Sequence, residues 1–368
     1  MKQQTSVATE TRNKVINKID YSGKTIFVGI DTHEKDYQVA KVIRGICLGN
    51  HRMKASYKEL VQHLRTHYPG ASFRCVYESG AWGFTLQRRL QEAGIDCMVV
   101  HAADVSTTDK ERRRKTDKVD ALKLARDLES GLLEAIYVPD EEIQKDRNLI
   151  RFRKKLKGDL NRSKNRFKSL LKYQGIIIPP QFGKACWSLK FMKWAELEAK
   201  KDILLQETLL LMLEEVKQLR QLLLKTEKKL QELMKCKYQQ KAQLLMSTPG
   251  IGRTLAMLFL LEVGDIRRFR GFDSLNDMIG FCPDTESSGD TERDRGITTR
   301  RHKQLRSGLL QAAWRAIRID PALLEAYQLL TLRMIPHKAI IRIARKLLRR
   351  MRTVLLTGQP YQLGIING

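Results

Sequence analysis

The sequence lacks the cysteine pairs and the long apolar runs that mark several classes of protein. Its 6 cysteines are scattered without any CxxC pair, which argues against a structural zinc site and against a small disulfide framework. No apolar run approaches the roughly 18–20 residues that a membrane-spanning helix needs. The polar N-terminus shows no apolar core of a secretory signal. These absences predict a cytoplasmic protein with reduced thiols and no membrane partner.

Acidic side chains are also scarce relative to basic ones. The 368 residues include 68 lysines and arginines but 41 aspartates and glutamates, which gives a formal net charge of +27. Each phosphate that a lysine or arginine neutralises releases a condensed counterion, so an excess of this size favours a polyanionic partner. Because no membrane-spanning run is present, nucleic acid is the polyanion that we expect.

Three regions follow a polar N-terminal segment, residues 1–23, which we expect to be a flexible extension. In the first region, residues 24–139, short apolar runs alternate with helical patterns, and this alternation indicates an α/β architecture. The stretch 45–49 is expected to form a turn. The expected strands are 25–30, 37–43, 73–77 and 96–100, and the expected helices are 57–67 and 82–93.

The second region, residues 140–241, has the periodicity of long helices. Apolar residues from Leu205 to Leu233 follow alternating spacings of four and three, the heptad pattern of a coiled coil, and only Thr226 interrupts it. This pattern fits an antiparallel hairpin within one chain, and it fits a dimerisation arm equally well. Periodicity alone does not choose between them.

One face of the earlier helix in this region is expected to be densely positive. Residues 145–172 contain twelve lysines or arginines against Asp146 and Asp159. A run of charges is commonly just a solvated face, but an excess of one sign favours a track that binds nucleic acid. The residues that we expect to contact phosphates are Arg151, Arg153, Lys154, Lys155, Arg162, Lys164 and Arg166.

The third region, residues 242–368, begins with two helical segments around the turn 249–252, PGIG, and ends in a basic helical tail. This arrangement is typical of a helix–hairpin–helix, in which the backbone N–H groups of Gly250 and Gly252 could bind a DNA phosphate. A plain connector between two helices is the simpler alternative.

Four carboxylates stand at positions where a metal site can form. Asp31 ends the first expected strand and Glu78 ends a later one, while Asp117 and Asp120 share a face of the helix expected after Thr116. Mg²⁺ prefers oxygen ligands, and two such ions can activate the attacking oxygen and stabilise the leaving oxygen of phosphoryl transfer. Taken singly, these acids also fit a turn, a strand end and a helix N-terminus. Together they are candidates for a site that holds Mg²⁺ or Mn²⁺.

Ordered motifs along the chain resemble one family of mobile-element enzymes. The segments 28–33 (VGIDTH), 77–80 (YESG) and 115–121 (KTDKVDA) are similar to those of the DEDD transposases of a large bacterial insertion-sequence group. That group is related to the Piv-type DNA invertases and is described as bridge-RNA-guided recombinases. The third region continues the resemblance in the same order, with segments 248–252 (TPGIG), 280–283 (GFCP), 287–289 (SSG), 296–298 (GIT) and 305–306 (LR).

The resemblance implies both a fold and a reaction. The implied fold is an RNase H-like, RuvC-like N-terminal domain with the metal acids, a coiled-coil linker, and a mostly α-helical C-terminal transposase domain. The resemblance also implies that Ser288, or Ser287 as the alternative, attacks a DNA phosphate and conserves the bond energy for rejoining. The implied partners are donor DNA, target DNA, an element-encoded bridge RNA and further copies of the chain, as a dimer or tetramer.

The sequence departs from the family where the family usually has Gly-Asn and this chain has Arg301 and His302. Arg300 and Arg301 are expected to contact nucleic acid there, and His33 is a candidate neighbour of the metal. From the residues alone, the serines 287–288 in a polar segment are typical of an ordinary turn. Two other functions stay open: a metal-dependent, Holliday-junction resolvase-like nuclease that uses water, and a non-catalytic scaffold that binds nucleic acid.

Overall fold

The chain divides into two compact units, Met1–Val138 and Pro139–Gly368, which we describe separately. The computed structural model describes residues 20–105, 116–183, 187–288, 291–298 and 301–364, with the backbone alone for residues 283–296. Within these ranges, no helix combines the length and the apolar character needed to cross a membrane.

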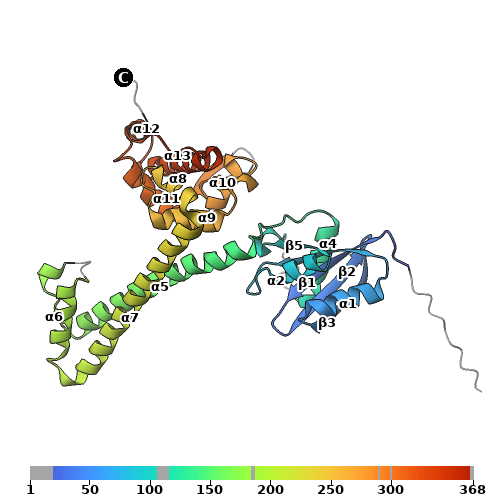
Figure 1. Cartoon of the computed structure of the whole chain (residues 1–368), viewed down its shortest axis with the longest axis horizontal. Coiled ribbons are helices and arrows are strands. Elements are labelled where there is room, and N and C mark those ends of the chain that lie inside the picture. Colours follow the sequence, from blue (N-terminus) through green and yellow to red (C-terminus); the bar gives the residue numbers. More distant parts are fainter. Residues whose placement is uncertain (1–19, 106–115, 184–186, 289–290, 299–300, 365–368) are drawn as a thin grey trace, which may run out of the picture. The chain divides into compact units, whose positions relative to one another are not determined.

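Unit 1 is built on one mixed five-stranded sheet in the order β3-β2-β1-β4-β5 (Figure 1). The strands β1, β4 and β5 are parallel, whereas β2 pairs antiparallel with both β1 and β3. The strands are β1 (Thr25–Thr32), β2 (Asp36–Ile43), β3 (Ile46–Lys54), β4 (Ser72–Glu78) and β5 (Asp96–Val100). The helices are α1 (Tyr57–His67), α2 (Thr85–Glu92), the short η1 (Ala102–Asp104) and α4 (Asp117–Glu129).

Helices cover both faces of this sheet. Strand alternation sends Val28 and Ile30 into a core with Leu60 of α1 and with α2. On the opposite face, Leu124 of α4 packs with Val76 of β4. The N-terminal region is therefore a mixed α/β domain, as the alternation of strands and helices predicts.

Gly29 brings α4 into direct contact with β1. A Cβ atom at this position would clash with the carbonyl oxygen of Ala121 and would lie 2.6 Å from the amide nitrogen of Ala125. Because both neighbours are backbone atoms, no side-chain rotation could relieve the clash. The glycine therefore lets the helix rest on the strand, with the start of α4 near the C-terminal end of β1.

Strand β3 shows that the expected turn over residues 45–49 is wrong in its extent. The turn is confined to Arg44 and Gly45, with φ values of 49° and 74°, and pairing with β2 resumes at Ile46. The strand lies at the edge of the sheet, where polar residues such as Asn50 and Arg52 are common and obscure the strand pattern.

A basic cluster lies between α1 and the sheet. Lys41 is fully buried, and its Nζ atom lies 2.9 Å from Nδ1 of His51. The ring of His51 lies 4.6 Å from that of His63, which in turn lies 4.1 Å from that of His67. Burial lowers the pKa of Lys41 to about 8. Burial and the charges of Lys41, His67 and His51 lower the pKa of His63 to about 4.

Unit 2 begins with a long antiparallel helical hairpin. Helices α5 (Glu141–Tyr173) and α7 (Ile203–Leu233) lie side by side (Figure 1). Ion pairs join residue 153 to 227 and residue 166 to 215, so the partners move back along α7 as they advance along α5. The heptad region therefore pairs within one chain. Its two helices are joined by η2 (Pro180–Phe182) and α6 (Leu189–Ala199).

The seam of this hairpin follows the predicted heptads. Leu209, Val216 and Leu230 are buried along it. Thr226, which breaks the apolar pattern, is buried as well, and its hydroxyl donates a hydrogen bond of 2.7 Å to the carbonyl oxygen of Leu222. Because its own helix satisfies this hydroxyl, the seam accommodates a polar residue.

The rest of unit 2 is mostly helical. Its central helix is α9, in which residues 256–263 are all buried. The strands β6 and β7 form a hairpin in which Ser287 and Ser288 are the last residues of β6, so the ordinary turn expected at these two residues is replaced by a strand end. The elements are η3 (Met234–Tyr238), α8 (Gln239–Ser247), α9 (Arg253–Val263), η4 (Ile266–Arg268), α10 (Phe272–Ile279), β6 (Pro283–Ser288), β7 (Thr291–Ile297), α11 (Lys303–Ala316), α12 (Pro321–Thr331) and α13 (Pro336–Thr357).

Packing against α11 requires a glycine at the first glycine position of the turn between α8 and α9. Gly250 has a φ of +81°, and a Cβ atom there would clash with the carbonyl group of Ala312 in α11. Gly252, the N-cap of α9, is exposed and has open space around the position of a Cβ atom. Packing therefore explains Gly250, whereas a phosphate contact at Gly252 stays a prediction.

Candidate metal centre and serine hairpin

Three side chains meet at the C-terminal end of β1. The Nε2 atom of His33 lies 3.3 Å from Oδ2 of Asp31 and 3.3 Å from Oδ2 of Asp117. One ligand atom from each residue lies within 4.8 Å of the others. Asp117 is the first residue of α4, and the hydroxyl of Thr116 caps this helix by accepting a hydrogen bond from the amide of Val119. Strand, loop and helix thus each supply one member of the group.

Glu78 lies on the neighbouring strand, outside this close group. The parallel strands β1 and β4 place Ile30 opposite Tyr77, so Asp31 and Glu78 are the next residues of the two strands. Asp31 follows Gly29 by two positions and Glu78 follows Val76 by two positions, and both Gly29 and Val76 face α4. Since side chains alternate along a strand, both acids are directed to the face that α4 covers.

Negative charge is concentrated around Asp31. Burial raises the pKa of this carboxyl group, and the charges of Asp117 and Asp120 raise it further, while His33 acts in the opposite direction. Asp120 therefore lies within electrostatic range of Asp31, although it is not a member of the close group. A carboxylate in this setting is short of positive charge, which a bound cation would supply.

Edge strand β3 supports the start of α4. Arg52 donates a hydrogen bond of 3.1 Å to Asp117, and its Nε atom lies 3.3 Å from Asp36. Asn50 donates a hydrogen bond of 2.8 Å to the carbonyl oxygen of Lys118. Sequence reasoning missed Asn50 and Arg52 because it missed strand β3. The signal that could have found them is their spacing of two positions, which places both side chains on one face of a strand.

The donor set at this end of the sheet fits a divalent cation. Two carboxylates and one imidazole lie close together, and in the described part of the chain they are the one group of metal-binding residue types that meets this spacing. Carboxylate oxygens suit Mg²⁺ and Mn²⁺, whereas an imidazole ligand moves the preference toward Mn²⁺ and later metals. Asp31, His33 and Asp117 are thus the residues that would hold the ion.

The two predicted serines lie at the end of strand β6, in an anchored hairpin. Ser287 and Ser288 are the last residues of β6, next to the loop that leads into β7. At the base of the hairpin, Arg306 donates hydrogen bonds to the carbonyl oxygens of Gly280, at 2.9 Å, and Thr298, at 2.7 Å. One guanidinium group therefore holds both ends of the hairpin. Of the two arginines expected to bind nucleic acid next to it, Arg300 lies outside the described residues.

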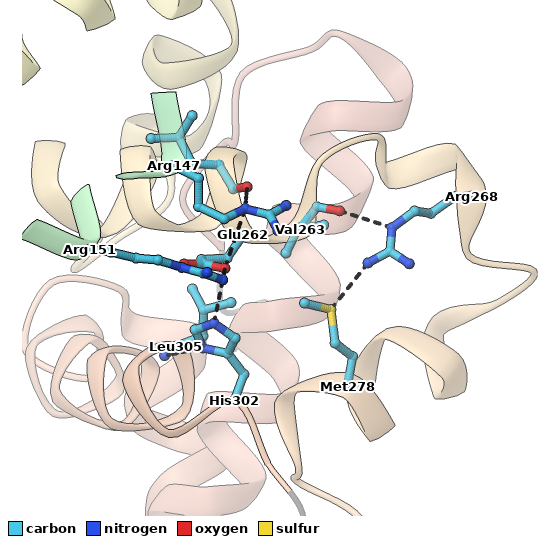
Figure 2. Close-up of polar contacts among 9 residues, drawn as sticks. Arg147, Arg151, Glu262, Val263, Arg268, Met278, His302 and Leu305 are labelled. Atoms are coloured by element: carbon cyan, nitrogen blue, oxygen red, sulfur yellow. Dashed lines mark hydrogen bonds and ion pairs between the residues drawn. The ribbon is translucent and has the colours of Figure 1, made fainter. Parts of the chain in front are cut away.

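A buried carboxylate joins the α5–α7 hairpin, which we call the arm, to the segment that follows the β6–β7 hairpin (Figure 2). Glu262 of α9 has a side chain only 3% exposed and accepts hydrogen bonds of 2.7 and 2.8 Å from Arg151 of α5. It also lies 3.5 Å from Nε of Arg147 and 3.4 Å from Nε2 of His302. Sequence reasoning missed Glu262, because a lone glutamate within an apolar helix carries no periodic signal, and it assigned Arg151 to phosphate binding instead.

Hydrogen bonding fixes the orientation of His302. Its Nδ1 atom accepts a hydrogen bond of 3.2 Å from the amide of Leu305, so Nε2 carries the proton that faces Glu262. Burial by itself would raise the pKa of Glu262, but hydrogen bonds from His302 and Arg151 and their charges lower it to about 2. The carboxylate is therefore ionised and holds α5, α9 and the start of α11 together.

Several predicted phosphate contacts on α5 have partners within the chain. Arg151 binds Glu262 and Arg153 binds Glu227, so both guanidinium groups serve helix packing. Lys154 and Lys155 are exposed. Of the remaining residues, Arg162 lies beside Asp159, the Nζ atom of Lys164 lies 5.6 Å from the centre of the Trp187 ring, and Arg166 binds Glu215. For all five residues, binding of phosphate stays a prediction.

Comparison with known proteins matches both halves of the chain to transposases. A family model described as a transposase of the DEDD type of IS110 matches residues 28–174. A second model, described as the transposase IS116/IS110/IS902 family, matches residues 242–328. The first match contains all four predicted metal acids, and the second contains the serine hairpin.

Individual relatives carry the same description. The chain is 28% identical over 242 residues to y4qE of Sinorhizobium fredii, which is named as a transposase, and the match covers 65% of this chain and 57% of that protein. It is 28% identical over 254 residues to the transposase for insertion sequence element IS1533 of Leptospira borgpetersenii, covering 66% of this chain and 71% of the relative. The chain thus spans little more than half the length of the first relative.

Proposed function

We propose that the chain is a transposase of the IS110 family, whose two models match residues 28–174 and 242–328, and that it cleaves and rejoins the DNA strands of an insertion element at a divalent-metal site in unit 1. The observation that carries this proposal is the meeting of Asp31, His33 and Asp117 at the end of β1. Glu78 and Asp120 complete the proposed acidic set. The mixed sheet with helices on both faces supports an RNase H-like, RuvC-like classification of this unit.

Each residue of the centre has a separate task. A divalent ion, when bound, would polarise a phosphate oxygen of the DNA and offset negative charge in the transition state. Asp31, His33 and Asp117 would hold it, since one ligand atom from each lies within 4.8 Å of the others. Arg52 and Asn50 keep the start of α4, and with it Asp117, in place.

The nucleophile that we propose is the hydroxyl of Ser288, with Ser287 as the alternative. Its oxygen would form a bond to the phosphorus of a DNA phosphodiester while the bond from phosphorus to one deoxyribose oxygen breaks. The serine proton leaves to a base, and the released deoxyribose oxygen gains a proton. Rejoining reverses these steps at a new strand end, so no external energy source is required. Support comes from the place of both serines at the end of an anchored hairpin.

The serine proposal is tested by trapping the protein–DNA linkage. A labelled DNA with an element end should become covalently attached to the wild-type protein, and the attachment should resist detergent. Ser288→Ala should abolish the adduct while DNA binding persists, and Asp31→Ala should abolish it as well. Cleavage without any adduct, unaffected by Ser288→Ala and Ser287→Ala, would instead support the resolvase-like nuclease that uses water. Binding with no cleavage, unchanged by Asp31→Ala, would support a scaffold.

A guide RNA and an assembly of several copies belong to the same proposal. The net charge of +27 supports a second polyanion besides DNA, and sequencing of RNA that copurifies with the protein tests for it. Ile203, Leu204 and Leu211 on α7 are 86%, 94% and 71% exposed, which supports packing of further copies on the arm. Light scattering should show a lower mass for Leu204→Glu combined with Leu211→Glu, and an unchanged mass would exclude this surface.

A further inference from the structure

The C-terminal end of α13, in the basic helical tail of the sequence, forms one wall of an open groove. The segment 359–362 forms the other wall, and the groove has a volume of about 750 Å³. Three cations line it: Lys346, Arg349 and Arg350. Because they are spaced by three and four residues on a helix, their side chains share one face.

The second wall is fixed by specific bonds. Tyr361 donates its hydroxyl to Asp320 at 2.5 Å, and its backbone amide donates to the hydroxyl of Ser247 at 2.8 Å. Asp320 is fully buried and also accepts a hydrogen bond of 2.8 Å from Arg350. The guanidinium of Arg350 lies 4.9 Å from the centre of the Tyr361 ring. The groove is therefore preformed, with its tail segment tied to α8 and to the start of α12.

Positive charge in the groove exceeds negative charge. Asp320 offsets Arg350, but neither Lys346 nor Arg349 forms an ion pair with a carboxylate among the described residues. The guanidinium of Arg349 lies 4.6 Å from the centre of the Phe272 ring, which orients it without neutralising it. Two cations therefore remain available to an anionic ligand, beside the side-chain amide of Gln359, whereas the hydroxyl of Thr353 donates to the carbonyl oxygen of Arg349 at 3.1 Å.

We infer that this groove binds the phosphate backbone of a nucleic acid strand, without reading its sequence. The inference rests on the proposed function, which makes nucleic acid the ligand of this protein. Cations on a rigid helix, with an amide donor beside them, are the groups that hold phosphates in register. Free phosphate or a mononucleotide presents the same chemistry, and the experiment separates these sources from a strand.

The test measures how the affinity of the full chain for a labelled 30-base-pair DNA of arbitrary sequence depends on salt. Lys346→Gln combined with Arg349→Gln removes two phosphate contacts and should lower the salt slope by about two. Between 50 and 200 mM salt, the wild type should then lose roughly 12–16-fold more affinity than this variant. Arg333→Gln combined with Arg342→Gln is the matched control, because it removes two exposed cations outside the groove. Lys346→Arg combined with Arg349→Lys should keep the wild-type slope.

The outcomes separate the inference from the proposed function. Equal slopes for the groove variant and the control, in a wild type that binds DNA, overturn the groove inference alone. A wild type that binds no DNA overturns the proposed function as well. Phosphate or AMP at constant ionic strength could stabilise the wild type but not the groove variant, while the salt slopes of DNA binding are the same for the two proteins. In that case the groove is a small-anion pocket and strand binding is wrong. Thermal melting of each variant checks that it is folded.

Discussion

Replacing Glu262 by glutamine removes the charge that holds the arm to the C-terminal helices. The substitution preserves the shape of the side chain, but it places a neutral amide against two arginines and a histidine (Figure 2). One of the two oxygens that accept from Arg151 becomes an N–H donor. The cations of α5 then lose their buried counter-charge.

The expected loss of stability is about 3 kcal/mol. The pKa of Glu262 is lowered from its ordinary 4.5 to about 2, and a shift of this size corresponds to about 3 kcal/mol. The side chains of Glu262 and Arg147 are 3% and 10% exposed, so solvent screens their interaction little, whereas Arg151 is 55% exposed and contributes less. Removing one partner from a buried ion pair gives a similar magnitude, about 3–5 kcal/mol. For a unit of this size the melting temperature should fall by roughly 6–12 °C.

The effect should depend on pH in a defined direction. Because the pKa of Glu262 is lower in the folded state than in the unfolded state, its stabilising contribution is complete above about pH 4.5 and is lost as the pH falls toward 2. Urea unfolding of the full chain, followed by circular dichroism at pH 7, 4.5 and 3, measures the difference between wild type and Glu262→Gln. That difference should shrink at the lowest pH.

Glu227→Gln is the matched control, since Glu227 also binds an arginine of α5 but is 34% exposed. It should cost about 1 kcal/mol or less, as expected for a solvent-screened pair. If Glu262→Gln costs no more than Glu227→Gln, or if its effect is the same at pH 7 and pH 3, the reasoning about the buried carboxylate is wrong.

Three further predictions concern unit 1. Gly29→Ala should lower the free energy of unfolding of unit 1 by about 3 kcal/mol or more in a urea titration, because the added methyl group meets the backbone of α4. In the same titration, Gly80→Ala should cost less than about 1 kcal/mol, because the position of its Cβ atom is open space. Mn²⁺ should raise the melting temperature of the wild type and leave that of Asp31→Asn unchanged, while Asp31→Asn without metal should be no less stable, since it removes a crowded negative charge; a full Mn²⁺ response in the variant would contradict the metal assignment. The lowered pKa of His63 means that the folded state resists protonation, so unit 1 should lose stability as the pH falls from 6.5 through 4. His63→Phe should weaken that acid dependence, as measured by circular dichroism, and an unchanged acid midpoint would count against the basic cluster.

The sequence alone determined the elements whose signals are local. Strand β1, helix α1 and the long helices α5 and α7 follow from apolar periodicity, because burial of one face imposes a period of two or of 3.6 residues. The four acids were recognisable by their places at strand ends and at a helix start. Which of them lie together was beyond the reach of periodicity, because that depends on strand order and helix placement.

Tertiary structure decided the features that depend on residues far apart in the chain. Edge strand β3 carries too little apolar alternation to be recognised, yet it supplies Arg52 and Asn50 to the candidate metal centre. Gly29 has meaning only once α4 rests on it. The pairing of α5 with α7 in one chain could not be read from heptads, since an apolar seam is the same whichever helix covers it. Glu262 lies in an apolar helix, and only packing against α5 and α11 brings Arg151 and His302 to its charge.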